Sequence, residues 1–316
     1  MASFNGETGA KEVVSALAKN VAGKTFLITG ASKGSLGAEV ATSLAAAGPK
    51  QFILVGRNEK NLGPVIEEIK SIDPKIKVTF VSGDMCDNDS LRKAGTEINA
   101  LDVTIDSIIC SAGIMAVREF TTSKDGIESQ FAANHVGHFL LTNLIIGKLA
   151  KESSFVTVTS TGYEAAEVNF DDYNFQQGKT YNPWYAYGQA TTAKILLAYA
   201  MGRKPGIAAF SVHPGYVPDT ALQSNNAVDM DLLIEGFKIG VERNGGKPLD
   251  PTPSRTVQQG AATIVLAAVD SAIRSKSPAY LTECNVKVAK EYATSAENVQ
   301  KLWKLSEKLV GQEFSL

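Results

Sequence analysis

The chain has 316 residues, of which 44% are hydrophobic and 20% are charged, so it can bury one large core or two small ones. Its formal net charge is −2, and its basic residues form no run, which argues against nucleic acid or an anionic membrane surface as the partner. The densest apolar stretch, 139–146, is too short to cross a bilayer. A small molecule is therefore the expected partner.

The chain has three cysteines, Cys86, Cys110 and Cys284. Their number is odd, they are scattered, and their spacing does not suit a metal site. This pattern favours free thiols in a reducing compartment, so we expect a cytoplasmic protein without a metal.

Short β-branched segments alternate with longer helical patterns along the whole chain. The predicted strands are 25–29, 51–55, 78–81, 107–110, 154–159, 208–212 and, as a seventh, 279–281. The predicted helices are 34–48, 58–71, 88–99, 123–150, 184–202 and a closing helix at about 296–311. This alternation predicts an α/β fold of the Rossmann type, with a doubly wound, seven-stranded parallel sheet in three layers.

No linker or internal repeat divides the chain, so 1–316 is interpreted as one nucleotide-binding domain. The segment 218–255 is too long for an ordinary connection in a compact domain and contains several Asn, Gly and Pro residues. Such insertions are usually lids or disordered loops, and we expect this one to be a substrate lid.

A glycine-rich turn separates the first strand from an alanine-rich helix. Glycines allow the backbone to approach a pyrophosphate, and the helix N-terminus offers unpaired N–H groups and a positive dipole end. The candidate phosphate contacts in this turn are Gly30, Ser32, Lys33, Gly34, Leu36 and Gly37.

The second strand ends in Gly56-Arg57-Asn58, where an NAD-binding site would offer a carboxylate to the ribose 2′-hydroxyl. Arg57 can instead pair with a 2′-phosphate, and Lys33 could add a second positive charge. This local chemistry favours NADP(H) as the cofactor. The alternative is that both side chains are solvated surface charges.

Two hydroxyl groups mark a candidate reaction centre. Ser160 follows the fifth predicted strand, and Tyr187 lies on the helix after it, in Tyr187-Gly188-Gln189-Ala190-Thr191. A positioned tyrosine can protonate an alkoxide as hydride arrives, or remove the proton in the reverse reaction. Alone, Ser160 could be a structural hydroxyl and Tyr187 part of an aromatic wall.

These motifs together resemble the short-chain dehydrogenase/reductase family, over about residues 8 to 314, and in particular its fungal, retinol-dehydrogenase-like and secondary-metabolism members. The resemblance implies that Tyr187 is the proton donor and that Ser160 orients the substrate carbonyl. It also implies that Asn134, in Asn134-His135-Val136-Gly137, holds a water on the proton-relay path. His135 and His138 are interpreted as packing residues.

The resemblance also assigns cofactor contacts farther along the chain. Asp84 matches the aspartate that contacts the adenine, although it could equally cap the helix that follows. Ala112 and Gly113 would let the adenosine side of the cofactor approach closely. The segment after the sixth strand would hold the carboxamide of the nicotinamide through Pro214, Gly215, Val217 and Thr220. Asp219, next to Thr220, could enter this carboxamide site.

The chain departs from the family pattern at two places. Cys110-Ser111 replaces a pair of asparagines that brace the central sheet, and Thr191 replaces the lysine one turn after the catalytic tyrosine. Thr191 can offer a hydroxyl to the nicotinamide ribose but no charge. The Cα atom of Lys194 would lie about 10.5 Å from that of Tyr187 along the helix axis. We therefore expect Lys194 to be a surface charge and not a replacement for the family's lysine.

The leading hypothesis is an NADPH-dependent reductase, or the reverse dehydrogenase, that acts on a hydrophobic carbonyl or alcohol. The two departures keep open a non-redox enzyme on the same scaffold, such as an isomerase, dehydratase or cyclase, or an NADP-binding protein without catalysis. The resemblance also implies a homodimer formed through the helices that carry Asn134 and Tyr187.

Overall fold

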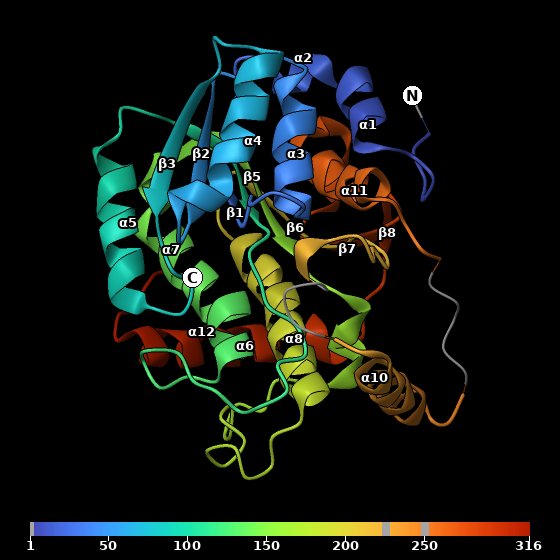
Figure 1. Ribbon diagram of the computed structural model, residues 1–316. Coiled ribbons are helices and arrows are strands. Elements are labelled where there is room, and N and C mark those ends of the chain that lie inside the picture. Colours follow the sequence, from blue (N-terminus) through green and yellow to red (C-terminus); the bar gives the residue numbers. More distant parts are fainter. Residues whose placement is uncertain (1–2, 223–227, 248–252) are drawn as a thin grey trace.

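The computed structural model describes residues 3–222, 228–247 and 253–316. One sheet runs through the molecule in the order β3-β2-β1-β4-β5-β6-β7-β8, with helices on both faces, so the predicted α/β fold of the Rossmann type is confirmed (Figure 1). Its strands are β1 (Thr25–Thr29), β2 (Gln51–Gly56), β3 (Lys77–Ser82), β4 (Ile105–Cys110), β5 (Leu149–Val158), β6 (Ile207–His213), β7 (Ala279–Thr282) and β8 (Asn285–Lys287).

The sheet has an eighth strand that the sequence did not predict, and it is antiparallel. β8 pairs with β7 through a two-residue turn made by Glu283 and Cys284, whose φ angles are 52° and 61°. Two-residue hairpin turns with positive φ usually contain Asn or Gly, which provide the sequence signal for a hairpin. The prediction of seven parallel strands was therefore wrong only at this edge of the sheet.

Each face of the sheet is covered by its own group of helices. One face packs against α3 (Leu36–Ala45), α4 (Glu59–Ile72) and α11 (Val257–Val269), and α1 (Ala10–Ala16) packs on the outside of α3 and α11. The other packs against α5 (Asn88–Ala100), α7 (Gly137–Leu144) and α8 (Pro183–Met201), and α12 (Ala296–Val310) packs on the outside of α8. Every residue of β1 is buried, as expected for a parallel sheet with both faces covered. A short helix, α2 (Ala18–Val21), leads into β1.

The single helix predicted at 123–150 is broken into shorter pieces. They are α6 (Ser129–Phe131), the π-helix η1 (Ala132–Val136), α7 and the 3-10 turn η2 (Ile146–Lys148), after which β5 begins at Leu149. The start is set by Glu128, whose buried carboxylate accepts hydrogen bonds from the backbone N–H groups of Gln130 and Phe131. A π-helical turn has no sequence pattern of its own, so apolar periodicity extended the prediction across it.

Part of the segment predicted as a lid is a helix, α10 (Met230–Arg243). It lies beside the start of α8, where the indole of Trp184 donates a hydrogen bond to the carbonyl of Leu232 at 2.6 Å. Residues 223–227 and 248–252 of this segment lie outside the described residues. The lid and the single-domain boundary stay predictions.

A close approach of two backbones fixes α8 against the 3-10 turn η3 (Thr161–Ala165), which follows Ser160. A Cβ added at Gly188 would lie 2.7 Å from the backbone nitrogen of Ala166 and 3.0 Å from the carbonyl oxygen of Gly162. Both neighbours are backbone atoms, so neither can rotate away.

We therefore predict that Gly188→Ala lowers the free energy of unfolding by about 1–3 kcal/mol, measured by urea denaturation, because it overpacks this contact. Gly63→Ala in α4 is the matched control, since a Cβ there meets nothing within 4 Å. That control should be neutral or stabilising by up to about 1 kcal/mol, because alanine suits a helix better than glycine. Equal effects of the two substitutions would contradict the packing argument.

Candidate active site

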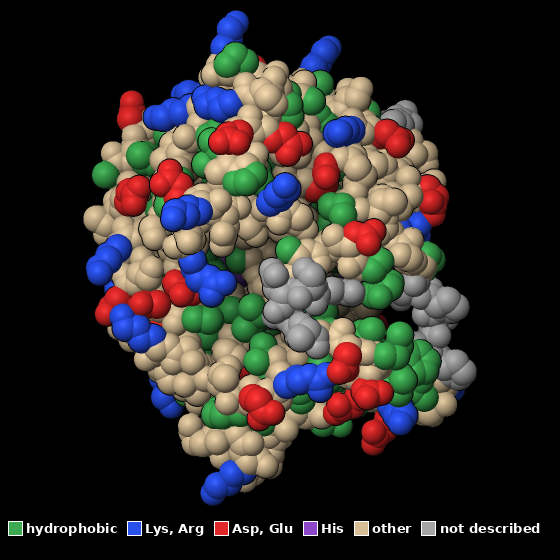
Figure 2. All heavy atoms as spheres, viewed as in Figure 1, with side chains coloured by type: hydrophobic (Ala, Val, Ile, Leu, Met, Phe, Trp, Pro, Cys, Tyr) green, Lys and Arg blue, Asp and Glu red, His purple; other side chains and the backbone are tan. Residues whose placement is uncertain are grey.

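A cavity of about 1420 Å³ lies at the carboxyl ends of the strands, near the point between β1 and β4 where the strand order of the sheet reverses. Figure 2 shows that this face of the molecule is hollowed near its centre. The predicted site residues that line the cavity are Gly30, Ser32, Leu36, Arg57, Asp84, Ala112, Gly113, Asn134, Ser160, Tyr187, Thr191, Pro214, Gly215, Val217 and Thr220. Three predicted contacts, Lys33, Gly34 and Gly37, are not part of its lining.

The glycine-rich turn is shaped by close backbone contacts. Gly30 has a φ of 71°, and a Cβ on it would lie 2.6 Å from the Cα of Ala112. A Cβ on Gly37 would lie 2.7 Å from the carbonyl oxygen of Gly30, so Gly37 permits packing within the turn. Ser35 caps α3 by accepting a hydrogen bond from the N–H of Ala38. Lys33 is exposed and does not contribute to the cavity wall.

Arg57 and Asp84 line the cavity after β2 and β3, where the resemblance places the adenosine. Arg57 is exposed, and among the described residues it forms no ion pair with a carboxylate. One carboxylate oxygen of Asp84 accepts the N–H of Cys86 at 2.9 Å. The helix α5 is capped by Asp87 instead, so the interpretation of Asp84 as a helix cap was wrong.

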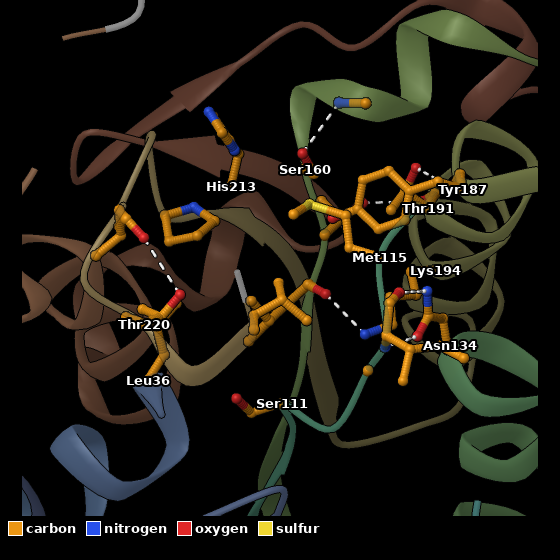
Figure 3. Close-up of a pocket in the computed structure, with 18 of the residues that line it drawn as sticks. Leu36, Ser111, Met115, Asn134, Ser160, Tyr187, Thr191, Lys194, His213 and Thr220 are labelled. Atoms are coloured by element: carbon orange, nitrogen blue, oxygen red, sulfur yellow. Dashed lines mark hydrogen bonds between the residues drawn. The ribbon is translucent and has the colours of Figure 1, made fainter. Parts of the chain in front are cut away.

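Ser160 and Tyr187 both line the cavity, and their side chains meet over Gly162. Figure 3 shows them at the end of β5 and on α8. Ser160 accepts the N–H of Gly162 at 3.0 Å, which leaves its own hydroxyl proton available for another acceptor. The ring of Tyr187 packs over Gly162, where an added Cβ would come within 2.7 Å of it, and meets the indole of Trp184 edge-on.

The electrostatic surroundings of Tyr187 keep its phenol protonated. Its side chain is 7% exposed, and burial raises its pKa above the ordinary value, while the neighbouring Ser160 hydroxyl opposes that shift. A protonated phenol beside a second hydroxyl can donate a proton to a bound oxygen atom. This pair is therefore suited to general acid catalysis.

Thr191 does not present its hydroxyl to the cavity in the expected way. The Oγ1 atom donates back to its own helix, at 2.8 Å from the carbonyl oxygen of Tyr187 and 3.1 Å from that of Gly188. A threonine that bonds back to the preceding turn has no second proton to donate to a ribose. It can still accept a hydrogen bond.

Lys194 is not a surface charge, so that prediction was wrong. The side chain is 3% exposed and lines the cavity, and its Nζ donates to the carbonyls of Val158 at 2.8 Å and Ala112 at 3.2 Å. The axial distance between Cα atoms was misleading, because helical side chains lean toward the helix N-terminus. The N-terminal end of α8 carries Tyr187, so the long lysine side chain extends back toward the site (Figure 3).

The turn after β4, residues 112–114, is held by side chains and not by a sheet ladder. The N–H of Ala112 donates to Thr29 Oγ1 at 3.1 Å, while its carbonyl accepts from Lys194. The amide of Asn134 accepts the N–H of Ile114 at 2.8 Å and donates to its carbonyl at 2.9 Å. Asn134 thus uses its side chain to fix this turn, and its role toward a water stays a prediction.

His138 binds both Thr29 and Asn134, the residues that hold this turn. Its Nδ1 lies 3.0 Å from the carbonyl oxygen of Asn134, which can only accept, so this nitrogen carries the proton. Its Nε2 then accepts from the Thr29 hydroxyl at 2.9 Å. Burial lowers the pKa of His138 to about 3, which keeps the ring neutral. His135 bonds to Ser306 at 2.7 Å, and both histidines are buried inside the fold.

The segment after β6 brings one predicted and one unexpected side chain to the cavity. Thr220 is buried and lines it, whereas Asp219 is exposed and does not intrude. His213 also lines the cavity and is 6% exposed, yet neither of its ring nitrogens has a hydrogen-bond partner among the described residues. Burial lowers the pKa of His213 to about 4, so the neutral ring offers one donor and one acceptor. Sequence reasoning gave it no role because a histidine before Pro-Gly has no distinctive pattern.

Together, the fold and the cavity define a Rossmann-type protein with a large cavity at the carboxyl ends of its strands, lined by Ser160 and Tyr187. The model of the short chain dehydrogenase family matches residues 24–174. The chain is 31% identical over 304 residues to short-chain dehydrogenase TIC 32 B, chloroplastic, of Brassica napus, covering 90% of this chain and 88% of that protein. It is 32% identical over 313 residues to short-chain dehydrogenase/reductase prx1 of Penicillium roqueforti, covering 92% and 86% respectively.

The chain therefore belongs to the short-chain dehydrogenase family. This makes it an oxidoreductase that uses a nicotinamide dinucleotide, NAD or NADP. Retinol dehydrogenase 11 of Homo sapiens is a more distant relative, 28% identical over 294 residues and covering 92% of this chain and 86% of that protein. A crystal structure of an uncharacterised protein from Mycobacterium paratuberculosis superimposes with a TM-score of 0.70 at 27% identity, covering 93% of this chain and 96% of that one.

Within the described residues, the helices include none that combines the length and apolar character needed to cross a membrane.

The buried ammonium of Lys194 predicts a pH dependence of stability. Burial lowers its pKa from 10.5 to about 8, so between these values the unfolded chain binds a proton that the folded chain has released. Stability therefore rises with pH in this window, by about 3 kcal/mol in total for this group. We predict that the wild type gains this amount relative to Lys194→Met between pH 7 and 10.5, measured by urea denaturation. A difference that stays constant with pH would contradict the assigned burial.

Proposed function

We propose that the protein is an NADPH-dependent reductase of hydrophobic carbonyl compounds, and that it catalyses the reverse alcohol oxidation less readily. The observation that carries this proposal is the Ser160–Tyr187 pair, in which burial keeps the phenol protonated at the centre of the cavity. Carbonyl reduction needs a proton donor, whereas alcohol oxidation needs the tyrosinate.

The residues of the cavity fit a dinucleotide. Gly30 lets the turn pass close to Ala112, and α3 then begins at Leu36, where a helix N-terminus favours a pyrophosphate. The ends of β2 and β3 lie beside the adenosine part, and there Arg57 has no carboxylate partner among the described residues. An arginine and no acid after β2 suits the 2′-phosphate of NADP(H). When bound, this cofactor supplies the hydride for the carbonyl carbon.

The protein's own residues supply the rest of the reaction. Ser160, whose oxygen is held by the N–H of Gly162, donates its hydroxyl proton as a hydrogen bond to the substrate oxygen. Tyr187 transfers its proton to the same oxygen, which becomes the alcohol, and is then reprotonated from solvent. Asn134 and Lys194 hold the neighbouring turn and do not touch the reacting atoms in this mechanism.

An apolar substrate suits the outer part of the cavity. Buried Met115 and Trp184 form a cluster with Tyr187 and with Leu232 of α10. Phe237 of the same helix lines the cavity although its side chain is 57% exposed. Figure 2 shows hydrophobic side chains gathered on this part of the surface. Retinol, after which one distant relative is named, is also a hydrophobic alcohol.

Three finer assignments belong to the same proposal. A place in fungal secondary metabolism rests on the family resemblance, and the relatives include oxidoreductases of the fungi Penicillium roqueforti and Fusarium equiseti. A cytoplasmic location is supported by free thiols at Cys86, Cys110 and Cys284. A homodimer through the helices that carry Asn134 and Tyr187 rests on the family resemblance alone.

We predict that Tyr187→Phe lowers the rate of NADPH oxidation with a hydrophobic ketone by at least about 100-fold, because the general acid is lost. NADPH binding, measured by fluorescence titration, should remain. Tyr185→Phe, two residues away on α8, is the control and should retain activity. Unchanged turnover in Tyr187→Phe would contradict the mechanism. Product formation without NADPH oxidation in the wild type would instead support a non-redox enzyme.

We predict that Arg57→Ala weakens NADPH binding by about 10–100-fold, because a charge-assisted contact with the 2′-phosphate is lost. NADH, which lacks this phosphate, should bind the variant and the wild type equally. Lys60→Ala, an exposed lysine on the adjoining helix α4, serves as the control for general electrostatic attraction. If Arg57→Ala weakened both cofactors equally, the assignment to the 2′-phosphate would be wrong.

We predict that His213→Leu raises the KM for the carbonyl substrate by about tenfold with a smaller change in kcat, because it removes the neutral donor and acceptor that face the cavity. Steady-state kinetics at saturating NADPH test this expectation. A fall in kcat alone, with KM unchanged, would show that His213 does not contact the bound substrate.

A further inference from the structure

A buried ammonium without a counter-ion is the most unusual electrostatic feature of the cavity. Among the described residues, no carboxylate pairs with Lys194, and its Nζ is bonded to two backbone carbonyls only. The titratable groups that influence it are Cys110 on β4, His135 in η1 and His138 on α7. Burial raises the pKa of Cys110 to about 12 and lowers that of both histidines to about 3, so all three are neutral near pH 7.

The two carbonyls that Lys194 binds belong to different strand ends. The ladder between β4 and β5 ends at the pair Cys110 and Thr157, and Ala112 and Val158 lie just beyond it. Past this point the two segments separate, since Ala112 enters the cofactor-facing turn and Val158 leads to Ser160. The ammonium therefore connects the two walls of the cavity where the sheet no longer does.

We propose that Lys194 is a positioning residue. Its ammonium links the carbonyl of Ala112, in the turn after β4, to that of Val158 at the end of β5, and we call this link the strap. The strap fixes the nicotinamide side of the cofactor site relative to Ser160. The strap explains how the site is braced although Cys110 and Ser111 carry no amide. It acts together with Thr29, which holds the N–H of the same Ala112 peptide, and with Asn134, which holds Ile114. The inference rests on the proposed function only in its kinetic readout.

The position of the lysine makes the strap specific to residue 194. Its Nζ would lie 3.7 Å from a Cβ added at Gly113, so the ammonium sits directly against the turn. A lysine at position 191 would begin one helical turn nearer to Tyr187 and would extend beyond these carbonyls. The strap is also not a device for overall stability, because desolvation of the ammonium opposes folding.

The test compares Lys194→Met with Lys304→Met, an exposed lysine on α12 that serves as the matched control. In the protein without cofactor, hydrogen exchange of the amides in 111–114 and 158–162 should become at least about tenfold faster in Lys194→Met and stay unchanged in the control. The melting temperature at pH 7 should stay the same or rise. Faster exchange throughout the molecule would indicate general destabilisation and overturn the proposal.

Binding and kinetics then separate positioning from chemistry. The Kd for NADPH should rise by about tenfold in Lys194→Met, and the loss in turnover should lie mainly in the KM for NADPH. A fall in kcat with unchanged exchange and unchanged NADPH affinity would assign Lys194 to the chemical step and overturn the strap. Restoration of both exchange protection and affinity by Thr191→Lys in the Lys194→Met background would also overturn it. If the wild type reduces no carbonyl, the proposed function fails while the exchange result still decides the strap.

Discussion

The site depends on how the short turn 112–114 is held at the end of a parallel sheet. Strand ladders stop before this turn, so its peptide groups need partners from side chains. Thr29 accepts the N–H of Ala112, and Lys194 donates to the carbonyl of the same residue. The Asn134 amide binds both the N–H and the carbonyl of Ile114. These side chains come from β1, α8 and η1, so three separate elements must pack correctly before the turn has one conformation.

This constraint links the core to the chemistry. α8 carries Tyr187 near its N-terminal end and Lys194 two turns later, and the close contact at Gly188 sets its distance from the turn that holds Ser160. In the proposed mechanism the same helix therefore provides the acid, positions the Ser160 hydroxyl and holds the turn after β4. Burial raises the pKa of the Tyr187 phenol, which keeps it in the protonated form that the proposed carbonyl reduction needs.

The sequence was sufficient for the architecture and for most of the cavity, because buried parallel strands and glycine turns have strong local patterns. The predictions were wrong or incomplete where three-dimensional geometry, and not a local sequence pattern, determines the structure. The hairpin at Glu283 and Cys284 lacks the usual turn residues, and the π-helix η1 continues an apolar pattern without a visible break. Lys194 was misplaced because counting along a helix axis ignores the direction in which a long side chain extends. His213 could not be found, since its isolation from other polar groups exists only in three dimensions.

The most direct test of the account is a titration of the purified protein with NADPH and with NADH, followed by the oxidation of the bound reduced cofactor in the presence of hydrophobic ketones and aldehydes. The account predicts tighter binding of NADPH than of NADH and reduction of at least one class of these carbonyl compounds. Binding of NADPH without any turnover across the panel would contradict the assignment of the Ser160–Tyr187 pair to carbonyl reduction. Preference for NADH would contradict the role given to Arg57.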